Sequence, residues 1–141
     1  MAEIDVVTEV EIARPREEVA TYAADPANAP EWYENIESVE RKSDSSVAFV
    51  ARFLGRRLAY TYEIRELVPG ERLVMSTSEG PFPMETTYEW WDAPGGTRMT
   101  LRNRGRPSGF ATIAAPALAA AMRRAGRKDL DRLKRILEAR A

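Results

Sequence analysis

Two of the side chains that most often take part in catalysis and metal binding, cysteine and histidine, are missing from this sequence. Its 141 residues include neither cysteine nor histidine. Disulfide bonds, thiolate nucleophiles, cysteine metal sites and Ser-His-Asp or Cys-His catalysis are therefore excluded. The commonest general base, which is also the commonest metal ligand, is missing as well. Acid–base chemistry would have to come from Tyr, Arg, Asp or Glu, and we expect neither a metal nor a cofactor.

Acidic residues that recur at short spacing do not predict a catalytic pair. Glu9 and Glu11 alternate with apolar residues, so both fall on the solvent face of one strand. Glu63, Glu85 and Glu89 share the same outward parity on later strands. The alternation places no carboxylate and no arginine toward the interior, which weighs against an enzyme.

Inward-facing polar side chains are the better candidates for a site. Tyr60, Tyr62, Tyr88 and Asn103 have inward parity on predicted strands. A buried hydroxyl or amide group needs a hydrogen-bond partner, which a ligand could supply. The simpler alternative, favoured for any single residue, is that these side chains only fill a core.

The elements that would position these residues follow from the hydrophobic periodicity. Residues 3–13 alternate strictly, which predicts a strand with one solvent face. Pro15, followed by two glutamates, predicts a helix that ends at Asp25-Pro26. A second short helix is expected over about residues 27–34. Turn signals then separate six strands, which predicts an antiparallel meander over residues 36–41, 46–54, 57–68, 72–78, 84–92 and 98–104.

A long amphipathic helix is predicted at the C-terminal end, from Pro116 to Arg140. Its apolar residues recur every three or four positions and define one stripe. Gly126 lies on that stripe, which indicates a close contact between the helix and the sheet, or a kink. The stripe comprises Leu118, Met122, Gly126, Leu130, Leu133 and Leu137.

The inward face of the sheet would be mostly apolar with a few hydroxyl groups. Such a surface suits a pocket for an apolar molecule that carries one or two polar groups. Residues 79–83 form a loop with an exposed aromatic residue, Phe82, which could cover the mouth of such a pocket or only connect two strands. The candidate ligand-binding residues from the strands and the long helix are Phe49, Tyr60, Tyr62, Met75, Thr86, Tyr88, Trp90, Asn103, Leu118 and Met122.

Composition and charge narrow the classes of protein. With 44% hydrophobic and 30% charged residues, the chain resembles an ordinary globular domain. No apolar run is long enough to span a bilayer, and the acidic start is no signal peptide, so we expect a cytoplasmic protein without integral membrane association. Residues 1–40 hold 11 acidic and 2 basic residues, whereas residues 117–141 hold 8 basic and 3 acidic ones. The basic end predicts attraction to the acidic end, or a solvated helix face, rather than binding to nucleic acid.

The order of elements and several local motifs resemble the START-like, or SRPBCC, superfamily, which includes polyketide cyclase/dehydrase-like proteins. The resemblance covers nearly the whole chain and implies one domain over residues 1–141. It implies an α+β helix-grip fold: a seven-stranded curved antiparallel sheet around a long C-terminal helix, with two short helices after the first strand. The matching segments are Ile12 to Val19, Pro30-Glu31-Trp32-Tyr33, Val68 to Val74, Gly95 to Thr100, and Asp129 to Glu138.

The resemblance leaves the function open, because one fold hosts many functions. It implies first a carrier or sensor that binds a small hydrophobic, lipid- or polyketide-like molecule between the sheet and the C-terminal helix. The second hypothesis is a polyketide cyclase, aromatase or dehydratase, and the third is a protein-binding module similar to the chaperone-activating branch. In the family, the segment around Trp32 borders the cavity entrance, so Trp32 joins the candidate binding residues. The sequence does not distinguish a monomer from a homodimer.

Overall fold

The structure, a computed structural model, describes residues 3–53, 55–79 and 82–140. Within these ranges no helix is long and apolar enough to cross a membrane. The predicted strand 46–54 ends at Leu54, which lies outside the described residues, as do Gly80 and Pro81 of the predicted loop 79–83.

The order of elements confirms the prediction from periodicity. Strand β1 (Ile4–Ile12) is followed by helix α1 (Arg16–Ala24), one 3-10 turn (Pro26–Asn28) and the short helix α2 (Ala29–Trp32). The remaining elements are β2 (Ile36–Ser43), β3 (Ser46–Phe53), β4 (Arg56–Val68), β5 (Arg72–Thr77), β6 (Met84–Ala93), β7 (Gly96–Gly105) and α3 (Phe110–Glu138).

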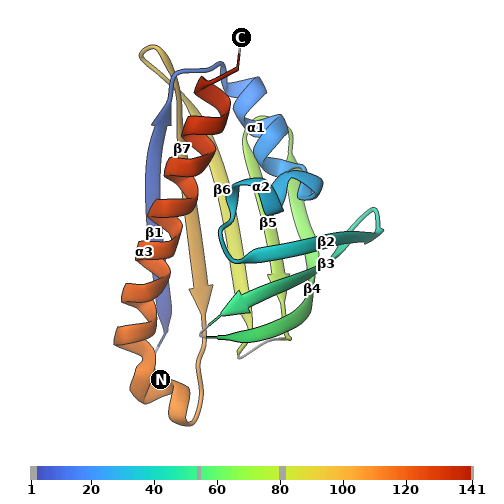
Figure 1. The fold of residues 1–141 in the computed structure, drawn as a ribbon, viewed down its shortest axis with the longest axis vertical. Helices are drawn as coiled ribbons and strands as arrows, with labels where there is room; N and C mark the ends of the chain where they lie inside the picture. The colour runs from blue at the N-terminus through green and yellow to red at the C-terminus, as the bar shows by residue number, and fades with distance from the viewer. Residues whose placement is uncertain (1–2, 54, 80–81, 141) are drawn as a thin grey trace.

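The seven strands form one antiparallel sheet in the order β1-β7-β6-β5-β4-β3-β2. Figure 1 shows that the sheet curves, so that β2 and β3 cross the view at a large angle to β1 and β7. Helix α3 runs along β1 in front of the sheet (Figure 1). Helices α1 and α2 lie beside the C-terminal half of α3. This is the helix-grip arrangement that the resemblance implies.

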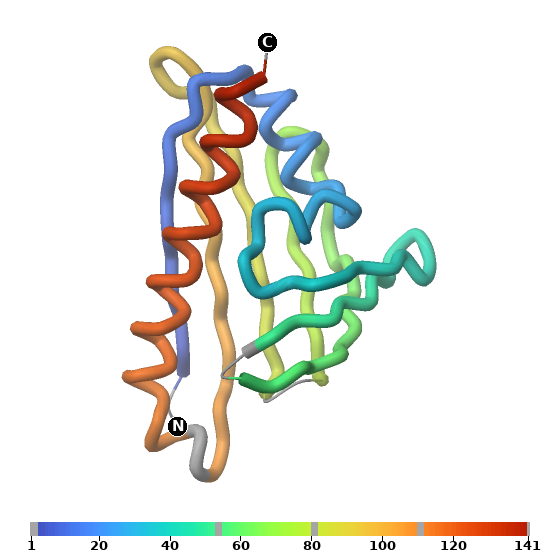
Figure 2. The backbone as a smooth tube through the Cα atoms, viewed as in Figure 1, coloured from blue at the N-terminus to red at the C-terminus, as the bar shows by residue number. Residues whose placement is uncertain are grey.

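The path of the chain brings the end of α3 back to the start of α1. In Figure 2 the chain runs down β7 and returns upward as α3 along β1. At the upper end, the Arg14 guanidinium donates to the Leu137 carbonyl at 3.0 Å, and Glu138 accepts the Ala13 N–H at 2.8 Å. These contacts hold the last turn of α3 over the β1–α1 connection.

The predicted start of the long helix at Pro116 is wrong. Helix α3 begins at Phe110, and Pro116 lies inside it. A proline inside a helix removes one hydrogen bond to the carbonyl four residues earlier. Pro116 itself is exposed, and Thr112, whose carbonyl loses this partner, is half-buried. The break falls instead at Gly109, whose φ of 62° is readily adopted only by residues without a Cβ.

The apolar stripe of α3 packs against the concave face as predicted. Leu130, Leu133 and Leu137 are at most 1% exposed. A Cβ at Gly126 would lie 2.8 Å from the Thr8 hydroxyl oxygen of β1, which is closer than real Cβ contacts allow. Glycine at this position therefore permits the close approach of α3 to β1, and no kink is needed to explain it.

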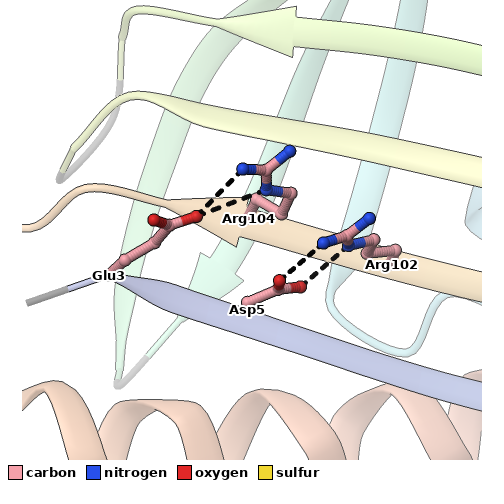
Figure 3. A network of polar contacts seen from close by, with 4 residues as sticks. All are labelled: Glu3, Asp5, Arg102 and Arg104. Carbon is pink, nitrogen blue, oxygen red and sulfur yellow. Dashed lines mark hydrogen bonds and ion pairs between the residues drawn. The ribbon is translucent and has the colours of Figure 1, made fainter.

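The convex face of the sheet carries ion pairs between β1 and β7. Figure 3 shows Asp5 facing Arg102 and Glu3 facing Arg104, with N···O distances of 2.6 and 3.1 Å. Glu9 pairs with Arg98 at 3.2 Å in the same row. The structure thus confirms that Glu9 lies on the solvent face, where its partner is an arginine of the neighbouring strand.

Candidate functional site

A cavity of about 230 Å³ lies between the sheet and α3. Strands β3 to β7 form one wall, and the middle of α3 forms another. Ligand pockets are concave spaces with a largely apolar lining and a few polar groups, and this cavity has such a lining. Nine of the predicted candidates line it: Phe49, Tyr60, Tyr62, Met75, Thr86, Tyr88, Asn103, Leu118 and Met122.

One wall of the cavity is aromatic. Phe49 of β3 meets Tyr62 of β4 edge to face, with 5.7 Å between the ring centroids, and Tyr60 meets Tyr62 at 5.5 Å. The antiparallel register pairs Phe49 with Tyr60 and thereby sets this cluster. Burial raises the pKa of Tyr60 and of Tyr62 above the usual value, so both phenols stay neutral at physiological pH.

Two further phenols form a hydrogen-bonded pair deeper in the molecule. The Tyr33 hydroxyl, just after α2, contacts the Tyr88 hydroxyl of β6 at hydrogen-bonding distance. Tyr88 is 2% exposed. Burial is the main cause that raises the pKa of both phenols, and the proximity of Asp129 adds to it. Sequence analysis did not select Tyr33, because the residue lies in a connection with no periodicity.

Asp129 is the carboxylate that the sequence analysis missed. The expectation that no carboxylate faces the interior is wrong, since Asp129 is 4% exposed and lines the cavity. Its position offered a signal: it lies three residues after Gly126 and four before Leu133, both on the apolar stripe of α3. Strand alternation cannot detect an inward carboxylate that lies on a helix.

The environment of Asp129 raises its pKa. Desolvation by burial raises its pKa to about 6, and the nearby Glu34 carboxylate acts in the same direction. The Glu34 backbone N–H donates to Asp129 Oδ1 at 3.0 Å, and this hydrogen bond, together with Arg132 and Lys128, opposes the rise. A carboxyl group that titrates near neutral pH inside a cavity can accept or release a proton under physiological conditions.

A second polar group lies on the adjoining strands. Thr86 of β6 and Asn103 of β7 face each other in the register, and the Thr86 hydroxyl donates to Asn103 Oδ1 at 2.7 Å. The amide nitrogen of Asn103 keeps donor capacity for a ligand in the cavity.

Trp32 and Trp90 do not line the cavity. Both are at most 2% exposed and belong to the core beside it. The ring centroid of Trp32 lies 4.2 Å from that of Tyr33 and 5.7 Å from that of Tyr88. The ring centroid of Trp90 lies 6.1 Å from that of Tyr88. The two indoles thus pack around the phenol pair and fix its position.

Phe82 is buried, and the prediction of an exposed aromatic residue at this loop is wrong. It is 7% exposed and packs with Ile4, Val6 and Ala115 in a small second core. This core forms because α3 begins at Phe110, before Pro116, so that Ala115 in its first turns lies against Phe82. Phe82 also lines the cavity at this end.

The exposed lining residues indicate where the cavity reaches the surface. Arg52, Asn35 and Glu79 are exposed and contribute to the wall. The Arg52 guanidinium forms an ion pair with Glu37, and Glu79 accepts the Thr61 N–H at 2.7 Å.

Over residues 3–53, 55–79 and 82–140, no group of three acidic side chains is arranged to hold a metal ion.

Comparisons with known proteins give a family and a fold. A family model described as polyketide cyclase / dehydrase and lipid transport matches residues 3–138. None of the curated proteins compared matches the sequence significantly.

Solved structures with the same architecture are distant in sequence. A protein of Thermus thermophilus aligns with a TM-score of 0.83 at 23% identity, over 97% of this chain and 99% of its own. The Zhui aromatase/cyclase of Streptomyces sp. R1128 aligns with a TM-score of 0.78 at 18% identity, over 94% and 92%. A START superfamily protein of Mycobacterium smegmatis gives 0.72 at 15% identity, over 95% and 94%.

Proposed function

Because the chain belongs to the polyketide cyclase/dehydrase and lipid transport family, we propose that it binds a small hydrophobic molecule between the sheet and α3, as a carrier or a sensor. The observation that supports this function is the cavity of about 230 Å³ with its largely apolar and aromatic wall. An engineered apolar cavity of about 150 Å³ binds benzene. A molecule of about two fused rings is therefore a suitable occupant.

A cavity-filling variant tests this function with a matched control. Ala51 lines the cavity from β3, whereas Ala59 is exposed on the neighbouring strand β4. Ala51→Phe would place a ring in the cavity, and Ala59→Phe would place the same ring in solvent. We expect Nile red to bind the wild type saturably, to bind Ala51→Phe at least about tenfold more weakly, a loss of roughly 1.4 kcal/mol, and to bind Ala59→Phe like the wild type.

The proposal would fail if the wild type bound no dye, or if Ala51→Phe bound it as well as the wild type. Circular dichroism shows whether each variant folds. If Ala51→Phe does not fold, Ala125→Phe fills the same cavity from the α3 side. Native mass spectrometry of the freshly purified protein would then identify the class of any co-purified ligand.

A second candidate is a cyclase- or dehydratase-type enzyme, and Asp129 is the observation that favours it. A carboxyl group with a pKa of about 6, beside the Tyr33–Tyr88 pair, is suited to general acid–base work. A cavity that holds a reactive chain would also supply proximity and orientation.

A simple probe of this chemistry is 5-nitrobenzisoxazole, a neutral bicyclic molecule. The Asp129 carboxylate would take the proton from the ring carbon as the N–O bond breaks, which yields a coloured cyanophenolate. We expect the rate to rise as the pH increases through about 6 and to fall by about 100-fold or more in Asp129→Asn. Asp131→Asn, an exposed neighbour, should leave it unchanged. Equal rates in Asp129→Asn and the wild type would remove the support for an enzyme.

A further inference from the structure

One group of polar side chains in the cavity lies where α3 faces the α2–β2 connection, apart from the Thr86–Asn103 pair on β6 and β7, and it limits the chemistry of a ligand. Asp129 of α3, Tyr33 after α2 and Tyr88 of β6 are close enough for the carboxylate to raise the pKa of both phenols. Leu118 and Met122 give another part of the wall an apolar surface. A ligand would therefore place its apolar body there and a polar group beside Asp129.

From this arrangement we infer that the cavity selects a neutral apolar ligand with a hydroxyl group, an alcohol or a phenol, and rejects carboxylates such as fatty acids. The inference rests on the proposed binding function and specifies the class of ligand. It depends on the hydrogen-bonding capacity at the polar end and on the charges around the cavity.

A hydroxyl group matches the hydrogen-bonding capacity at the polar end. An ionised carboxylate has about four acceptor positions, and the Glu34 N–H occupies one on Asp129 Oδ1. In the Tyr33–Tyr88 pair one hydroxyl donates to the other, which leaves the second hydroxyl hydrogen free to donate elsewhere. A ligand hydroxyl can donate to Asp129 and accept from this phenol at the same time.

A carboxylate ligand meets the opposite situation. Its charge would lie beside that of Asp129 in a desolvated space, where like charges repel strongly. The charged and titratable groups around Asp129 are Tyr33, Tyr88 and Glu34, with Lys128 and Arg132 on exposed faces of its own helix. Among the described lining residues the basic one is Arg52, which is exposed and already paired with Glu37. The described lining residues therefore offer no unpaired basic side chain to compensate a second negative charge.

Four probes with one naphthalene ring system separate shape from charge. Displacement of Nile red near neutral pH would give the affinities of 2-naphthol, 2-naphthoate, 2-methylnaphthalene and 2-naphthylmethylamine. We expect wild-type protein to bind 2-naphthol at least threefold tighter than 2-methylnaphthalene and at least tenfold tighter than 2-naphthoate. Preference for the amine over 2-naphthol, or equal affinity for naphthoate and naphthol, would overturn the inference.

Asp129→Asn removes the charge and keeps an oxygen that can accept the Glu34 N–H. We expect it to raise the affinity for 2-naphthoate at least tenfold and to change that for 2-naphthol by less than threefold. Asp131→Asn, exposed on the same helix, should keep the wild-type ratio. An unchanged ratio in Asp129→Asn would contradict the role of the charge, and the wild-type ratio decides the ligand class even if this variant does not fold.

The probes distinguish failure of the selectivity from failure of the binding function. If Nile red and 2-methylnaphthalene bind while naphthol and naphthoate bind equally, the cavity is a binding site without the proposed selectivity. If none of the probes binds, both the selectivity and the binding function are wrong.

Discussion

At the scale of single residues, the carboxyl group of Asp129 is buried against the preference of its charged form for water. Its pKa is raised from 3.8 to about 6, so the folded protein holds the proton more tightly than the unfolded chain. The resulting stabilisation is complete below pH 3.8 and is lost as the pH rises through about 6. A group of this kind makes the protein less stable at neutral pH than an uncharged residue would.

We therefore predict that the free energy of unfolding of the wild type falls between pH 4 and 7, relative to that of Asp129→Asn. The shift corresponds to at most about 3 kcal/mol. Urea unfolding of both proteins at each pH measures the difference, in which the contributions of the other carboxylates cancel. A difference that does not vary with pH would show that Asp129 titrates like an exposed carboxyl group.

The hydroxyl groups of the tyrosines differ in what holds them. The Tyr88 hydroxyl is hydrogen-bonded to that of Tyr33. For Tyr60, burial and the neighbouring Tyr62 raise the pKa, and no hydrogen bond from the described part of the chain contributes to the shift. We predict that Tyr88→Phe lowers the free energy of unfolding by about 0.5–1.5 kcal/mol, because it removes the hydrogen bond between the Tyr88 and Tyr33 hydroxyls. Tyr60→Phe should lower it by less than about 0.5 kcal/mol. Similar losses in both variants would mean that the Tyr60 hydroxyl is also bound within the protein.

At the scale of elements, the contact between α3 and β1 depends on a glycine. Gly→Ala in a helix usually stabilises it by up to about 1 kcal/mol. At Gly126 the added Cβ would lie 2.8 Å from Thr8 Oγ1 and 3.2 Å from its Cγ2. We predict that Gly126→Ala destabilises the wild type but stabilises the Thr8→Ala variant, in which both atoms are absent. A double-mutant cycle in urea tests this, and additive effects would contradict it.

The apolar stripe of α3 supplies a second prediction at this scale. Leu133 is 0% exposed and belongs to the main core. Leu133→Ala should lower the free energy of unfolding by about 2–5 kcal/mol, whereas Arg135→Ala on the exposed face of the same helix should change it by less than about 0.5 kcal/mol. A loss below about 0.5 kcal/mol for Leu133→Ala in chemical denaturation would show that α3 does not form part of the core.

At the scale of the whole molecule, the acidic charge of β1 is balanced mainly by basic residues of β7 on the outer face of the sheet. The acidic residues of β1 pair with arginines of β7, as Figure 3 shows for Asp5 and Glu3. The basic helix contacts the acidic end through Lys134, whose ammonium donates to the Glu11 carbonyl at 2.7 Å. Arg123, Arg124, Arg127 and Lys128 of α3 are exposed, which agrees with the predicted solvated helix face. The arginines of β7 supply much of the charge that compensates the acidic β1.

Exposed pairs of this kind contribute little to stability. The Arg102 hydrogen bond lowers the pKa of Asp5 in the folded protein. The pair therefore stabilises the fold above the pKa that Asp5 has in the unfolded chain, and this stabilisation is lost as the pH falls through the lower pKa of the folded state. The side chains of Asp5 and Arg102 are 38% and 43% exposed. We predict that Asp5→Asn lowers the free energy of unfolding by less than about 1 kcal/mol and that added salt reduces the difference. A larger, salt-independent loss in urea would indicate a desolvated pair.

Local patterns predicted the sheet well because side-chain direction in a strand is a local property. Successive residues point to opposite faces, whatever they pack against. The residues of β1 are therefore buried and exposed in strict alternation, and Tyr60, Tyr62 and Tyr88 reach the cavity wall as expected. The helix start was predicted less well, because a proline can stand in the first turn of a helix or, as Pro116 does, further inside it.

The sequence by itself thus determined the order of the elements, the inward faces of the strands and the absence of cysteine and histidine chemistry. Only the tertiary structure decided that Tyr33 contacts Tyr88 with Asp129 nearby, that Trp32 and Trp90 lie beside the cavity, and that Phe82 is buried. The physical reason is that these placements depend on the rotation of α3 and on its distance from the sheet. Both are set by contacts between residues far apart in the chain, such as Gly126 with Thr8, which no local periodicity encodes.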